Sequence, residues 1–144
     1  MSCYPGPSAV VGVGVDVVET SRIGKAYAKH GERFLERLYT PTEVAYCTAK
    51  RPNAMIACLA ARFAAKEAVM KALGTGRRGV SFNEIGVLNW RGGRPGIELR
   101  GRAAEVAARL GIDEVCISIS HGRDVAVVVA LAVRHSRREE GARS

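Results

Sequence analysis

Two carboxylates lie in segments whose other residues are mostly small or apolar. Asp16 follows the valine- and glycine-rich run 10–15, and Glu67 interrupts an alanine-rich helical segment at 59–73. An ionised group that is buried without a partner is costly, so neither segment gains by burying its carboxylate. A shared explanation is a divalent cation acting on a phosphorylated substrate, because Mg²⁺ prefers oxygen ligands and is rarely caged by protein alone. The pair therefore predicts a Mg²⁺ site.

A lysine and a glycine-containing turn follow Glu67. Lys71 comes four residues later and projects from the same side of a helix, which the Gly-Thr-Gly turn at 74–76 closes. Such small residues let backbone N–H groups approach a phosphate closely. A simpler alternative is an i,i+4 pair between Glu67 and Lys71 on a solvated face, worth about 0.2–0.5 kcal/mol. Asp16 could likewise cap the next helix, whose dipole Glu19 could serve equally well.

A histidine and several basic residues form further candidate groups. His121 follows a predicted strand, where its ring nitrogens could donate to a phosphate or simply belong to a turn. Arg22, Lys25 and Lys29 follow helical spacing and make a basic stripe, which is either a solvated face or a docking surface. Arg62 points to a different side of its helix from the carboxylate.

Length and composition limit the possible classes. The 144 residues suffice for one domain, and 47% of them are apolar. We find neither a secretory signal peptide nor a run approaching the about 18–20 apolar residues that span a membrane. The net charge of +8 predicts an anionic partner. Nucleic acid is disfavoured, because aromatic residues make only 6% of the chain and zinc-finger or RNP-type patterns are missing.

The cysteines predict a redox state and a location. Cys3, Cys47, Cys58 and Cys116 are widely scattered, with no CxxC spacing. We interpret them as reduced, packed thiols of a cytoplasmic protein, not as a disulfide framework or a zinc site.

The elements that must position these residues follow from the sequence pattern. We expect a strand at 9–19, helices at 22–29 (capped by Thr20 or Ser21), 32–38, 40–49 and 55–73, strands at 84–89 and 96–100, a helix at 102–110, and strands at 114–120 and 125–133. Thr40, Pro41 and Glu43 give the strongest helix-start signal. Residues 1–8 are predicted to be a flexible extension, 9–133 the domain, and 134–144 a charged, disordered tail. This order predicts an α+β fold, with helices on one face of a mainly antiparallel sheet.

Taken together, these segments resemble the holo-acyl-carrier-protein synthase family, the short single-domain 4′-phosphopantetheinyl transferases. The resemblance runs from about Val11 to Val133. It is carried by GVGVDVVE at 12–19, by RFAAKEA through KALGTG at 62–76, and by SISH at 118–121. In addition, LYTPTE at 38–43 is similar to the family's leucine-threonine-x-x-glutamate element.

The resemblance implies an activity and the residues that perform it. The family transfers the 4′-phosphopantetheine arm of coenzyme A to a serine of an apo acyl carrier protein, leaving 3′,5′-ADP. By position, Asp16 and Glu67 correspond to the Mg²⁺ ligands and Lys71 to a lysine near the pyrophosphate. Coenzyme A contacts are expected at Arg62, Lys71, Gly74, Thr75, Gly76, Arg94, Pro95 and His121. The acidic carrier is expected to dock on Arg22, Arg33 and Phe34, and the family commonly forms homotrimers with the coenzyme A site between subunits.

Two other functions remain as alternatives at this point. A basic RNA-binding α+β module would explain the charge, but it would leave Asp16 and Glu67 without a purpose. A catalytically silent scaffold would keep the fold alone, and the intact Asp16, Glu67, Lys71 and His121 argue against it. Phosphoryl transfer, which relies on positioning and charge neutralisation, accounts for more of these residues.

Overall fold

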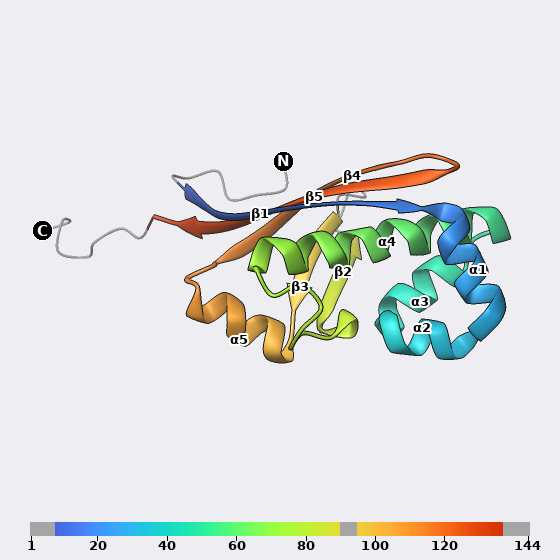
Figure 1. Ribbon diagram of the computed structural model, residues 1–144, viewed down its shortest axis with the longest axis horizontal. Helices are drawn as coiled ribbons and strands as arrows, with labels where there is room; N and C mark the ends of the chain where they lie inside the picture. Colours follow the sequence, from blue (N-terminus) through green and yellow to red (C-terminus); the bar gives the residue numbers. More distant parts are fainter. Residues whose placement is uncertain (1–7, 90–94, 137–144) are drawn as a thin grey trace, which may run out of the picture.

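The computed structural model describes residues 8–89 and 95–136. Its elements are β1 (Ser8–Glu19), α1 (Thr20–His30), α2 (Glu32–Leu38), α3 (Pro41–Thr48), α4 (Pro52–Leu73), the short helix η1 (Phe82–Glu84), β2 (Ile85–Asn89), β3 (Pro95–Leu99), α5 (Gly101–Arg109), β4 (Glu114–His121) and β5 (Val125–His135). One antiparallel sheet has the order β1-β5-β4, and β2 pairs with β3 in a second one. This arrangement confirms the predicted α+β class (Figure 1).

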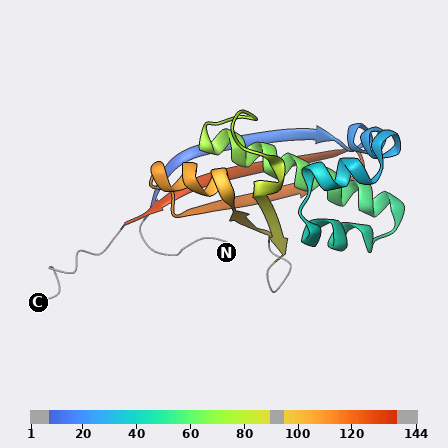
Figure 2. The same cartoon turned by 90° about the horizontal axis from the view of Figure 1, so that it is seen from below.

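The long helix α4 runs along one face of the three-stranded sheet, as Figure 1 shows. Helices α1, α2 and α3 gather at one end of the molecule, and α5 lies toward the other end. Strands β2 and β3 lie between these two groups in both views (Figures 1 and 2). The helix that carries Glu67 is therefore the central element of the fold, because both sheets and the helical groups are arranged around it.

Two glycines allow β1 to lie directly against α4. A Cβ atom at Gly12 would collide with the carbonyl oxygen of Ala72, and one at Gly14 with that of Ala68. Side chains alternate along a strand, so Asp16 points to the same side as these glycines. The glycine-rich pattern of β1 thus places this carboxylate at the seam between the sheet and the helix.

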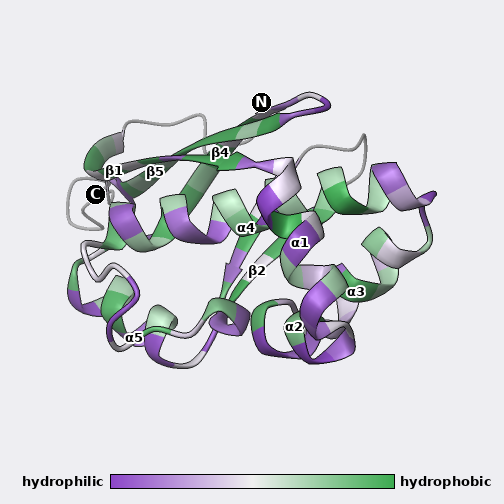
Figure 3. Ribbon diagram, turned by 45° about the vertical axis from the view of Figure 1, so that its right-hand side comes forward, coloured by the Kyte–Doolittle hydropathy of each residue, from purple (hydrophilic) through white to green (hydrophobic). Residues whose placement is uncertain are grey.

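The opposite face of the same sheet is apolar and exposed. Val13, Val15 and Val17 of β1 are 60%, 51% and 58% exposed, and Val129 of β5 is 38% exposed. Figure 3 shows mainly hydrophobic colours along β1 and β5, and hydrophilic colours over much of α1 and α2. Exposed apolar patches of this kind are typical of surfaces that contact another protein.

Most predicted boundaries agree with the structure to within a few residues, and three differ for identifiable reasons. Helix α1 begins at Thr20 with Glu19 as its N-cap, so the prediction that Thr20 or Ser21 caps it is wrong. Helix α4 begins at Pro52, because proline fits the first position of a helix. Strand β5 continues through Arg134, whose guanidinium donates to the carbonyl oxygens at 110 and 111. The rest of the predicted N-terminal extension, at 1–7, and the rest of the predicted tail, at 137–144, lie outside the described residues.

The prediction of reduced cysteines is wrong for the pair that the structure describes in full. Cys47 of α3 and Cys58 of α4 form a disulfide, with their Cα atoms 5.7 Å apart. The short connection between these helices brings the two residues together despite their separation of 11 in sequence. None of the cysteines within the described ranges is a free thiol. The cytoplasmic location therefore stays a prediction, without the support of reduced thiols.

Candidate active site

Asp16 and Lys71 lie together at the seam between β1 and α4. Lys71 Nζ is 3.1 Å from Asp16 Oδ1 and also donates to the carbonyl oxygen of Val15 at 2.9 Å. The Asp16 side chain is only 11% exposed, whereas that of Lys71 is 53% exposed. Two of the predicted site residues are thus brought together, although the sequence did not predict them as a pair, and the lysine reaches toward solvent.

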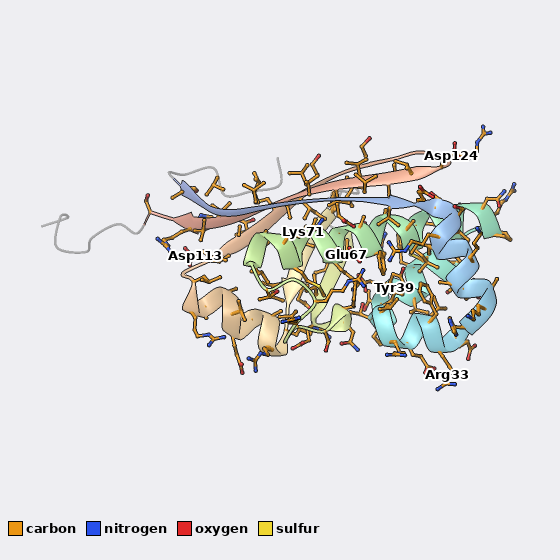
Figure 4. All side chains as sticks on the ribbon, in the orientation of Figure 1. Arg33, Tyr39, Glu67, Lys71, Asp113 and Asp124 are labelled. Carbon is orange, nitrogen blue, oxygen red and sulfur yellow. A yellow bond between two sulfur atoms is a disulfide. The ribbon has the colours of Figure 1, made fainter. Side chains whose placement is uncertain are left out.

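Glu67 lies one turn before Lys71 on the same helix, and Figure 4 labels both side chains along α4 beneath β1. Its side chain is 13% exposed, so the carboxylate is largely withdrawn from solvent. It forms an ion pair with Arg77, which follows the Gly-Thr-Gly turn. The simpler alternative predicted an i,i+4 ion pair between Glu67 and Lys71, but Lys71 contacts Asp16 instead. Sequence reasoning missed Arg77, since a loop residue ten positions away has no fixed spacing to Glu67.

The turn at 74–76 is engaged with the end of α4. Gly74 has a φ of 78°, the left-handed conformation that ends many helices, and Gly76 has a φ of 57°. The backbone N–H of Gly74 donates to the carbonyl of Lys71, and that of Thr75 to the carbonyl of Met70, each at 3.1 Å. These amides cap the helix, so phosphate binding by Gly74, Thr75 and Gly76 stays a prediction.

The donor set at this seam fits a divalent cation completed by a substrate. Asp16 Oδ2 is buried and has no hydrogen-bond partner within the described part of the chain. The same part contains no cluster of three or more His, Cys, Asp or Glu residues arranged to hold a metal. Two carboxylates alone suit Mg²⁺, which usually takes one or two protein carboxylates and fills its shell with water and phosphate oxygens.

Arg62 and His121 lie in a different place, together with Pro95. These residues line a cavity of about 680 Å³, and neither Asp16 nor Glu67 is among its lining residues. Arg94, the other residue predicted near Pro95, lies outside the described residues. The structure therefore divides the predicted coenzyme A contacts of one chain into two groups.

The Arg62 guanidinium is a buried cation of this cavity. It is 5% exposed, its Nη1 contacts Cys58 Sγ at 3.2 Å, and its charged end lies 4.6 Å from the ring centre of Tyr46. Within the described ranges its Nε and Nη2 atoms have no hydrogen-bond partner. Burial lowers the pKa of Arg62 below its usual value, while Glu43 opposes that shift. Two unused N–H groups beside a cavity favour an anionic ligand such as a phosphate.

A second cavity, of about 880 Å³, is lined in part by the ion-pair partner of Glu67. Its lining includes Arg33 and Phe34, two of the residues predicted to dock the carrier, and also Arg77, which pairs with Glu67. The third predicted docking residue, Arg22, lies nearby with its guanidinium 5.3 Å from the ring centre of Phe63. Arg77 therefore connects the cavity at the basic end of the molecule with Glu67.

A buried ion pair fixes α4 immediately before Glu67. Lys66 Nζ is 2.7 Å from Glu43 Oε1, and both side chains are fully buried. Glu43 also accepts the backbone N–H groups of Thr40 and Val87, each at 2.8 Å, and Lys66 donates to the carbonyl of Phe82 at 3.0 Å. The predicted capping box at Thr40 and Glu43 is confirmed. Its link to Lys66 was missed, because spacing along the chain does not reveal contacts between separate helices.

Comparison with known proteins decides the family. Residues 12–130 match the model of the 4′-phosphopantetheinyl transferase superfamily. The chain belongs to this superfamily. It is 50% identical over 124 residues to a holo-[acyl-carrier-protein] synthase of Desulforudis audaxviator, and this match covers 86% of the chain and 93% of that protein.

Solved structures agree with this assignment. An acyl carrier protein synthase of Plasmodium yoelii with ADP bound is 30% identical and has a TM-score of 0.80, covering 91% of the chain and 100% of that structure. A Helicobacter pylori holo-[acyl-carrier-protein] synthase in complex with coenzyme A is 31% identical, with a TM-score of 0.72 and coverages of 83% and 98%. The resemblance inferred from the sequence blocks is confirmed at the level of family and fold.

Proposed function

We propose that this chain transfers the 4′-phosphopantetheine arm of coenzyme A to a serine of an apo acyl carrier protein, giving holo carrier protein and 3′,5′-ADP. The observation that carries this proposal is the pair Asp16 and Glu67 at the seam. One buried carboxylate oxygen there has no partner among the described residues, and a lysine lies beside it. Neither a silent scaffold nor an RNA-binding module gives these buried carboxylates a role. The holo-[acyl-carrier-protein] synthases to which the chain is similar support the same activity.

In this proposal Asp16 and Glu67 hold Mg²⁺. A bound Mg²⁺ supplies charge neutralisation at the pyrophosphate and helps the ADP oxygen to leave. Lys71, whose Nζ lies at the solvent-facing side of Asp16, adds a positive charge toward the same pyrophosphate. The serine oxygen forms a bond to the β-phosphorus, and the bond from that phosphorus to the bridging oxygen of ADP breaks. Glu67, or a water held by Asp16 or Glu67, accepts the serine proton.

The separation of the predicted coenzyme A contacts supports a site shared between chains. Arg62, Pro95 and His121 line a cavity without the two carboxylates. The exposed valines of β1 and β5 provide a surface through which a second copy could complete the site. We therefore propose a homotrimer in which each coenzyme A molecule lies between two chains. Arg62 and His121 of one chain bind its nucleotide end, and its pyrophosphate lies at Asp16 and Glu67 of the neighbouring chain.

The carrier protein is assigned to the basic end of the molecule. Arg33 and Phe34 line the same cavity as Arg77, the ion-pair partner of Glu67, and Arg22 lies on the neighbouring helix α1. The net charge of +8 complements an acidic partner, and complementary charge raises association rates. Docking there would bring the carrier serine close to the Glu67 carboxylate.

Intact-mass spectrometry of an apo acyl carrier protein tests the proposal. Incubation with this protein, coenzyme A and Mg²⁺ is expected to add the mass of one phosphopantetheine arm, and EDTA is expected to prevent the addition. The variant Glu67→Gln should lose the transfer while keeping its circular dichroism spectrum, because the change preserves size and removes only the charge. A Glu67→Gln variant with a near-normal rate would contradict the assignment.

A further inference from the structure

Arg77 is the present partner of the Glu67 carboxylate. Its Nη2 pairs with Glu67 Oε1, and its side chain is 59% exposed while that of Glu67 is 13% exposed. The Arg77 guanidinium also lies 5.7 Å from the ring centre of Phe82, which stacks on Phe63 at 5.2 Å. The arginine thus lies close to both a carboxylate and an aromatic ring.

Arg77 lies in a turn outside the helices and strands, and its side chain is largely exposed. Gly76 and Gly79, on either side, have φ angles of 57° and 79°, a conformation that favours glycine. Residues 77–79 belong to neither a helix nor a strand. Movement of Arg77 away from Glu67 would therefore break no helix or sheet hydrogen bond.

Each carboxylate at the seam carries one resident cation. Lys71 contacts Asp16 Oδ1, whereas Asp16 Oδ2 keeps no partner in the described part of the chain. At Glu67 the resident cation is Arg77, on Oε1. A divalent cation that binds both carboxylates is repelled by Lys71 at Asp16 and by Arg77 at Glu67. At Asp16 it can use Oδ2, which has no partner within the described residues.

We propose that Arg77 is a positioning residue, which holds Glu67 in the metal-free protein and is displaced when a divalent cation binds Asp16 and Glu67. This inference rests on the metal site of the proposed function. Because Arg77 also lines the cavity assigned to the carrier, its release places a positive charge beside the incoming acidic partner. Binding of the metal at Glu67 thereby changes the charge of the surface on which the carrier docks.

Metal titration of the full chain tests this inference without coenzyme A or carrier. Free Mn²⁺, a spectroscopic substitute for Mg²⁺, is measured by electron paramagnetic resonance at low ionic strength. The variant Arg77→Gln should bind Mn²⁺ roughly two- to fivefold more tightly than the unmodified protein, the range expected when one exposed ion pair no longer competes. Added salt should reduce this difference.

Arg78→Gln is the matched control, because Arg78 is the next residue, is exposed, and loses the same charge. Its Mn²⁺ affinity should stay near that of the unmodified protein, and Arg77→Lys should fall between the two variants. If Arg77→Gln binds no more tightly than Arg78→Gln, the role of Arg77 is refuted while the metal site stands. If the unmodified protein binds no Mn²⁺, or binds it as well with Glu67→Gln, the metal assignment itself is refuted, and the inference with it.

Discussion

The buried Lys66–Glu43 pair is expected to control the stability of the domain. The two side chains are fully buried, and between them they connect α3, α4 and β2. Burial lowers the pKa of Lys66, and the Glu43 carboxylate opposes that shift. The substitution Lys66→Met removes the ammonium group and keeps a flexible, similarly long side chain, so it leaves the Glu43 charge buried without its cation.

The expected cost follows from these contacts. Removing one member of a buried ion pair costs about 3–5 kcal/mol, and Glu43 keeps two backbone N–H donors, so the lower part of this range applies. Since small domains have a total stability of about 5–15 kcal/mol, this loss is a large fraction of it. The double variant Glu43→Leu with Lys66→Met should not recover stability, because the N–H groups and carbonyls that now bond to the pair would each lose a partner, at about 1–3 kcal/mol.

Urea unfolding followed by circular dichroism measures these differences, at one fixed protein concentration because assembly also stabilises a protein. Lys71→Met is the matched control: it is the same substitution on the same helix, but it breaks an ion pair whose lysine is 53% exposed, so it should cost at most about 1 kcal/mol. The reasoning would be refuted if Lys66→Met cost no more than Lys71→Met, or if the double variant matched the unmodified protein.

Three further outcomes are expected. Reducing the disulfide, or replacing Cys47 and Cys58 by alanine, should lower the free energy of unfolding by about 2–4 kcal/mol. Urea titrations with and without a reductant measure this difference, and equal unfolding midpoints would count against it. Burial raises the pKa of Tyr39, whereas in the unfolded chain the phenol ionises near its usual pKa of about 10. The free energy of unfolding should therefore fall as the pH rises above about 10, and it should fall less in Tyr39→Phe. Val15→Glu should convert the proposed trimer to monomers in light scattering, because a charge on the exposed sheet face opposes burial; an unchanged mass would place the interface elsewhere.

Local signals in the sequence predicted most of the elements. The capping box at Thr40 and Glu43 and the helix end at Gly74 need only residues that are close in the chain, and both appear in the structure. These features depend on backbone geometry that short segments determine by themselves. By contrast, the close approach of β1 to α4 at Gly12 and Gly14 joins two distant segments, and the sequence analysis did not predict it.

Contacts between separate elements were harder to predict. The Lys66–Glu43 pair, the Glu67–Arg77 pair and the Cys47–Cys58 bridge each join residues with no periodic spacing. For the same reason the sequence identified Asp16, Glu67, Lys71, Arg62 and His121 as one set, whereas the chain places them in two groups. The proposed site between subunits would produce this result, since a single sequence pattern does not record which chain supplies which residue.

The most direct test of the shared active site is complementation between two inactive variants. Glu67→Gln removes the carboxylate at the seam, and His121→Ala removes the imidazole that lines the cavity with Arg62. Neither substitution disturbs a buried core contact. Each variant alone should transfer little phosphopantetheine. When the two are refolded together in equal amounts, random assembly should give an intact Glu67 facing an intact His121 at about one third of the sites in mixed trimers. This is about one quarter of all sites, and about that fraction of the activity should return. Activity no higher than that of the separate variants, in trimers shown to contain both chains, would contradict the account.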